Sequence, residues 1–160
     1  MAKTFREGPI GALMDEYERA TKELQKLLKT MNDDTYVRII DAQTKDKDCQ
    51  SVQTIMNHVV RAGFGYCNYI RKQFGDDFIE RKTYYNVATP KLAIAELNNV
   101  LKYTEETLSN KWNISWRKIR ANIIHTTWKQ DFDMDQLLEH AIVHILRHRR
   151  QIEKLLSFKL

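Results

Sequence analysis

Apolar residues recur every three or four positions in four segments of the chain, which is the spacing of an amphipathic α-helix. These segments span residues 9–31, 52–74, 90–109 and 134–156. Four long amphipathic helices in one chain of 160 residues predict an all-α fold, a four-helix bundle, in which sites are built from side chains on facing helices.

Residues with known preferences for helix ends support four of these boundaries. Pro9 suits a first-turn position of the first helix, and Thr89-Pro90 combines a cap with a first-turn proline for the third. Gly75 ends the second helix. Residues 133–136, Asp-Met-Asp-Gln, have the form of a capping box at the start of the fourth.

Two stretches between these helices lack a continuous apolar period. Residues 35–48 are polar and charged, and we interpret them as a connection in which Asp46 or Asp48 caps the second helix. Residues 111–132 hold all three tryptophans and mix helical with extended signals. We therefore expect a long structured connection between the third and fourth helices.

Composition and length favour a single helical domain covering residues 1–160. Apolar residues make up 42% of the chain, with five glycines and two prolines, which is typical of long regular elements. There is no run of about 18 apolar residues, and residues 1–9 have no apolar core of the kind that a secretory signal carries. We accordingly expect no membrane span and a cytoplasmic location.

The positions of the cysteines argue against a disulfide, and the distribution of charge argues against nucleic-acid binding. Cys49 and Cys67 are expected on one helix, about 27 Å apart, so they should be free thiols. The formal net charge is +5, but only residues 147–150 are locally basic, which favours a solvated helix face. Nucleic-acid binding through these arginines is therefore the lowest-ranked hypothesis.

The fourth helix repeats histidine every four residues within its apolar pattern. His144 and His148 lie about 40° apart around a helix axis and about 6 Å apart along it, so both imidazoles can reach one ion. A structural histidine that is hydrogen-bonded at the edge of the core is the competing interpretation for each of them. His140 lies further toward the polar side and is expected at the rim rather than as a ligand.

A third ligand should come from another helix, and His58 borders the apolar stripe of the second. His58, His144 and His148 together would suit Zn²⁺, Ni²⁺ or another borderline ion and leave a coordination position open. His58 can also be a boundary histidine without a metal. For His125 we expect a structural hydrogen bond.

These residues resemble the DinB/YfiT-like superfamily of small metal-binding four-helix bundles. The resemblance is carried by residues 54–62, Thr-Ile-Met-Asn-His-Val-Val-Arg-Ala, and by residues 144–152, His-Ile-Leu-Arg-His-Arg-Arg-Gln-Ile, and it covers nearly the whole chain. It implies that His58, His144 and His148 are metal ligands, that a low-molecular-weight thiol such as bacillithiol or mycothiol is a co-substrate, and that the chain forms a homodimer. Many members have glycine where this chain has Arg150.

Several neighbours of the histidines have two interpretations each. Gln151 either orients an imidazole or covers the site. Arg147 and Arg150 either receive an anionic substrate or form a solvated face, and the second interpretation is favoured.

Asp135 and Glu139 are possible extra metal ligands, but acidic residues in the first turns of a helix are usually surface groups. Three aromatic residues have two interpretations: Tyr66, Tyr69 and Trp128. They could line a substrate cavity, but aromatic residues at helical spacing more commonly belong to the core.

Two function classes follow for this chain. The first is a metal-dependent enzyme, a thiol S-transferase or a hydrolase acting on a small-molecule substrate, in which the ion lowers the pKa of a bound thiol or water. The second is a non-catalytic metal- or ligand-binding helical bundle. It is motivated by the lack of an unmistakable base or nucleophile near the three histidines.

Overall fold

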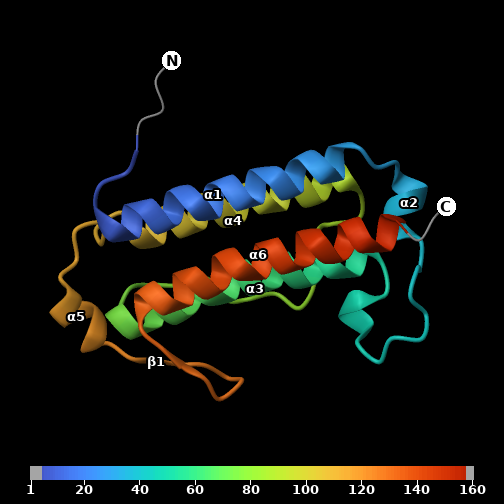
Figure 1. The fold of residues 1–160 in the computed structure, drawn as a ribbon. Helices are drawn as coiled ribbons and strands as arrows, with labels where there is room; N and C mark the ends of the chain where they lie inside the picture. The colour runs from blue at the N-terminus through green and yellow to red at the C-terminus, as the bar shows by residue number, and fades with distance from the viewer. Residues whose placement is uncertain (1–4, 158–160) are drawn as a thin grey trace.

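The computed structural model describes residues 5–157, which are mostly helical, so the all-α prediction is confirmed for this part of the chain. Residues 1–4 and 158–160, which the single-domain prediction included, lie outside the described residues. The four long helices are α1 (Gly8–Lys29), α3 (Val52–Phe74), α4 (Pro90–Leu108) and α6 (Met134–Ser157) (Figure 1). Among the described residues, no helix is both long and apolar enough to cross a bilayer.

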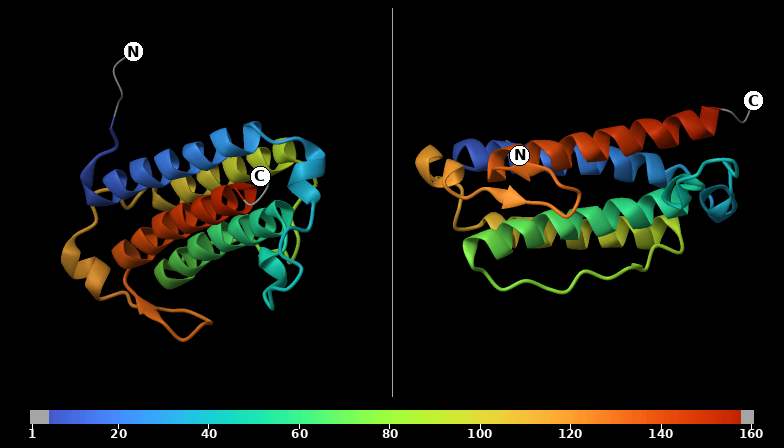
Figure 2. Two further views of the ribbon diagram at one scale, coloured as in Figure 1. Left: turned by 45° about the vertical axis from the view of Figure 1, so that its right-hand side comes forward. Right: turned by 90° about the horizontal axis from the view of Figure 1, so that it is seen from below.

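Each long helix packs against two others. α1 contacts α6 and α4, and α3 contacts α4 and α6, as the two further views in Figure 2 also show. The adjacency of α3 and α6 is the one that positions the site, because it brings together residues that are about 90 positions apart in the sequence.

The core lies between these four helices and is filled by their apolar faces. Its largest fully buried side chains include Ile10, Met14, Leu24, Leu28, Ile55, Met56, Ile70 and Leu97. Gly63 allows α3 and α4 to approach closely, because a Cβ at this position would lie 2.5 Å from Val100 Cγ1.

The observed caps confirm some of the predicted boundaries and correct one. Thr89 accepts a hydrogen bond from the backbone of α4, and Gly75 ends α3 in the left-handed conformation at φ 75°. Asp133 and Gln136 form the predicted reciprocal capping box, with distances of 2.9 and 3.0 Å. The prediction that Asp46 or Asp48 caps the second long helix was wrong, since Ser51 is its N-cap.

The connection between α1 and α3 contains the short helices α2 (Asp33–Val37) and η1 (Lys47–Cys49). Asp46 caps η1 by accepting from the backbone N–H of Asp48. Cys49 therefore lies in η1, and the prediction of one helix carrying both cysteines was wrong. Both thiols are free, as expected, and Cys67 is buried.

The segment from 76 to 89 runs back along the outside of α3 and α4 (Figure 2). Two asparagines of α3 hold it: Asn68 donates to the carbonyl of Ile79 at 2.7 Å, and Asn57 accepts from the backbone of Tyr85 at 2.9 Å. Asn57 also donates to the carbonyl of Thr83 at 3.3 Å. The residues between these anchors are thereby fixed beside α3.

The long connection before α6 is structured, as predicted. It contains α5 (Trp116–Arg120) and an antiparallel pair of two-residue strands, β1 (Ile124–His125) and β2 (Asp131–Phe132). The turn between the strands rests on α3, because the backbone N–H of Thr127 donates to the Tyr69 hydroxyl at 2.9 Å. This contact places Trp128 beside Tyr66 and Tyr69 in the C-terminal half of α3 and beside His140 near the start of α6.

Candidate metal centre

Three histidines converge between α3 and α6. His58 comes from α3, and His144 and His148 come from successive turns of α6. The His144 Nε2 atom lies 2.9 Å from His58 Nε2 and 3.2 Å from His148 Nε2. The structure therefore brings together the three predicted ligand residues, each with one nitrogen atom within 4.8 Å of the others.

These separations suit a common ion. Tetrahedral coordination with Zn–N bonds of about 2.0–2.1 Å separates ligand nitrogens by about 3.3 Å, close to the two distances around His144. All three side chains are half-buried, so the nitrogens face a partly desolvated space. The donor set thus fits a borderline divalent cation.

The second nitrogen of two rings has an acceptor beside it. His58 Nδ1 lies 3.3 Å from Asp48 Oδ2, and His148 Nδ1 lies 2.9 Å from Gln151 Oε1. Asp48 also pairs with Arg61. These acceptors keep the ring protons of His58 and His148 on Nδ1 and leave their Nε2 lone pairs directed at His144. Of the two interpretations of Gln151, contact with an imidazole is the observed one.

Burial disfavours the charged form of two of these imidazoles. Burial, together with the neighbouring imidazoles of His148 and His58, lowers the pKa of His144 to about 3. Burial likewise lowers the pKa of His148. At neutral pH the rings of His144 and His148 are therefore neutral, and the single ring proton of His144 can satisfy only one of the two Nε2 atoms beside it.

His140 and His125 lie outside the cluster, as predicted. His140 is half-buried and stacks on Trp128, with ring centroids 6.1 Å apart. His125 is exposed and bonds to Asp131, Nδ1 to Oδ1, at 2.7 Å across the hairpin. Each therefore serves the rim or the hairpin and not the ligand set.

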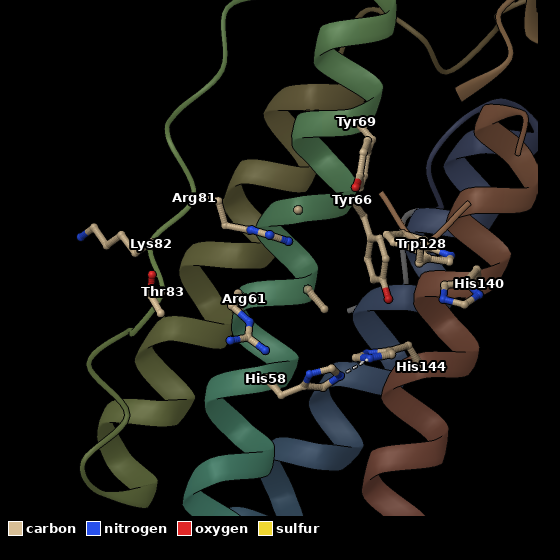
Figure 3. Close-up of a pocket in the computed structure, with 12 residues that line it drawn as sticks. His58, Arg61, Tyr66, Tyr69, Arg81, Lys82, Thr83, Trp128, His140 and His144 are labelled. Atoms are coloured by element: carbon tan, nitrogen blue, oxygen red, sulfur yellow. Dashed lines mark hydrogen bonds between the residues drawn. The ribbon is translucent and has the colours of Figure 1, made fainter. Parts of the chain in front are cut away.

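A cavity of about 520 Å³ opens beside the cluster (Figure 3). His58 and His144 lie at one end of it. Tyr66, Tyr69 and Trp128 line one wall, so these residues do face a cavity, although Tyr66 is also part of the core.

The opposite side of the cavity is cationic and was not predicted. Arg61 and Arg81 lie there, from α3 and from the segment between α3 and α4. Arg61 follows His58 by three residues, so helical spacing offered a signal for it. Arg81 lies in a segment without periodicity, which gave none. Arg147 and Arg150 are exposed and do not line this cavity.

The carboxylates proposed as extra ligands are not in the cluster. Asp135 and Glu139 lie in the first turns of α6, and neither belongs to the three-histidine group or to the cavity lining. Asp48, which was not predicted for this role, is the acidic residue that contacts a histidine of the cluster, His58, in the described part of the chain.

Comparisons of this chain with family models, with curated proteins and with solved structures found no match.

Proposed function

We propose that the chain is a metal-dependent enzyme of the thiol S-transferase or hydrolase type, in which His58, His144 and His148 hold one divalent ion, zinc or nickel. The convergence of three Nε2 atoms, with separations of 2.9 and 3.2 Å around His144, carries this proposal. Three neutral imidazoles leave the charge of the ion intact, and such an ion supplies activation of a bound thiol or water near neutral pH.

The remaining residues supply orientation and shielding. Asp48 and Gln151 hold the rings of His58 and His148 with the Nε2 lone pairs inward. Burial raises the pKa of Tyr66, so its hydroxyl stays protonated, and Figure 3 shows this hydroxyl directed toward His144. Trp128 and His140 contact each other and line the cavity on the side of the hairpin.

The proposal includes a four-helix bundle of the DinB/YfiT-like kind. The pairwise packing of α1, α3, α4 and α6 supports it, as does the origin of the three histidines from two facing helices. In this family such a centre would use a low-molecular-weight thiol as co-substrate.

A non-catalytic ligand-binding bundle is the second candidate, and one observation favours it. No aspartate or glutamate lines the cavity in the part of the chain described here, so a carboxylate general base is lacking within it. Under this alternative the same cavity holds a ligand without transforming it.

Metal content tests the proposal directly. Untagged protein loaded with Zn²⁺ and dialysed should retain about one ion per chain by elemental analysis. His144→Ala should lose it, whereas His125→Ala, which removes an exposed histidine outside the cluster, should retain it. Equal retention by His144→Ala, or no metal in the unmodified chain, would contradict the proposal and favour the non-catalytic bundle.

A further inference from the structure

The cavity beside the three histidines carries an arginine, Arg81, that has no carboxylate partner among the described residues. Arg81 forms no ion pair with a carboxylate of residues 5–157, whereas Arg61 pairs with Asp48. An arginine presents five N–H donors in a plane, and these donors match the two oxygens of a carboxylate. One unpaired guanidinium thus faces the same cavity as His58 and His144.

Gly65 lacks a side chain, which leaves room for the Arg81 side chain to lie across α3. A Cβ at Gly65 would lie 3.1 Å from Arg81 Nη1 and 3.6 Å from its Cδ. Figure 3 shows the guanidinium passing over α3 toward the cavity, while the ammonium of the adjacent Lys82 is directed away from it. The hydrogen bonds of Asn57 and Asn68 hold the segment on both sides of Arg81.

The wall opposite Arg81 is aromatic. The rings of Tyr69 and Trp128 meet edge to face with centroids 5.5 Å apart, and Tyr66 meets Trp128 at 6.3 Å. Such a wall favours a flat apolar group over a flexible polar one. The cavity volume of about 520 Å³ is that of a small-molecule site.

We propose that the substrate is a small carboxylate with a flat apolar body. Its carboxylate binds Arg81, its body lies against Tyr66, Tyr69 and Trp128, and its other end reaches the His58 and His144 end of the cavity. This inference rests on the proposed function, since it names the substrate class of the same centre. A carboxylate is favoured over a phosphate because the helical residues of the lining come from the interiors of α3 and α6, so no helix N-terminus contributes backbone N–H donors.

A pair of probes of nearly the same size and shape, one charged and one neutral, tests this inference. Binding of 3-phenylpropanoate and of its amide, 3-phenylpropanamide, is measured by titration calorimetry on the protein as purified. We expect the carboxylate to bind about tenfold more tightly than the amide, and Arg81→Gln to abolish this preference. Lys82→Gln removes the same charge one residue away and should change the preference less than twofold, because its ammonium is directed outward.

A second variant tests whether the apolar body of the probe lies against the aromatic wall. Trp128→Leu should weaken the carboxylate and the amide by the same factor, since it removes aromatic surface and no charge. Equal binding of the two probes, a preference that survives Arg81→Gln, absence of binding at millimolar concentration, or unchanged affinities in Trp128→Leu would each overturn the inference.

Elemental analysis of the same samples separates this outcome from that of the proposed function. If the protein holds metal but shows no Arg81-dependent preference for the carboxylate probe, the metal centre is supported and the carboxylate substrate is contradicted. If the preference depends on Arg81 but no metal is present, the carboxylate site is supported and the metal-dependent enzyme is contradicted.

Discussion

Asp48 joins the histidine cluster to the cationic side of the cavity, because it contacts both His58 and Arg61. Removing it as Asp48→Ala leaves the Nδ1 of His58 without its acceptor and frees the ring to rotate. We expect the affinity for Zn²⁺, measured by competition with a chelator, to fall by about 10- to 100-fold.

The matched control for this prediction is Asp135→Ala. It removes a half-buried carboxylate of α6 that does not belong to the cluster, so the Zn²⁺ affinity should be unchanged. An Asp48→Ala variant that binds Zn²⁺ within twofold of the unmodified chain would show that His58 needs no acceptor.

At the scale of single residues, the sequence identifies the three clustered histidines better than the residues that contact them. The four-residue spacing of His144 and His148 is a property of one helix and is readable from the sequence. The approach of Asp48 to His58 depends on how a 14-residue polar connection folds back, and that of Arg81 on two asparagine side chains of another element. Neither leaves a periodic signal in the sequence.

At the scale of helices, competition between capping residues explains the incorrect boundary. Asp46, Asp48 and Ser51 all have good N-cap side chains. Ser51 forms a reciprocal capping box with Thr54, whose Oγ1 accepts from the Ser51 backbone N–H at 3.0 Å. Asp46 is used instead to start η1.

The contact between α3 and α4 at Gly63 gives a prediction about stability. In Gly63→Ala the new Cβ would lie 2.5 Å from Val100 Cγ1, and valine has little rotamer freedom to move away. Overpacking of about 1–3 kcal/mol should exceed the gain in helix propensity of up to about 1 kcal/mol, so urea denaturation should show a lower free energy of unfolding.

Gly65→Ala provides the control on the same helix. Its new Cβ meets the flexible Arg81 side chain at 3.1 Å, so the free energy of unfolding should be unchanged or higher.

The double variant Gly63→Ala with Val100→Ala should be less destabilised than the sum of the effects of the two single variants. Strict additivity would mean that the two residues do not clash.

At the scale of the whole molecule, the site is a product of helix adjacency. Apolar periodicity predicts that four helices exist, but it does not specify which pairs are neighbours, because each helix has one apolar face that suits several partners. The placement of α3 beside α6 unites His58 with His144 and His148. The hairpin that carries Trp128 could not be predicted, since its strands are only two residues long.

The buried imidazoles also couple the stability of the whole fold to pH. In metal-free protein, burial holds the pKa of His144 at about 3, below its ordinary value of 6.5, and lowers those of His148 and His140 as well. Below pH 6.5 the unfolded chain binds protons at these residues that the folded chain does not. The stability contributed by the neutral rings is therefore present above pH 6.5 and is lost as the pH falls toward the folded pKa values.

Urea denaturation in the presence of a chelator at pH 7.5 and pH 5 measures this coupling. His144 alone should account for a loss of at most about 2 kcal/mol between these conditions, and His144→Gln should show a smaller loss than the unmodified chain. Bound Zn²⁺ should steepen the dependence, since it stabilises the folded chain while its ligands remain deprotonated. An identical pH dependence in His144→Gln would mean that the proton uptake on unfolding occurs at other groups.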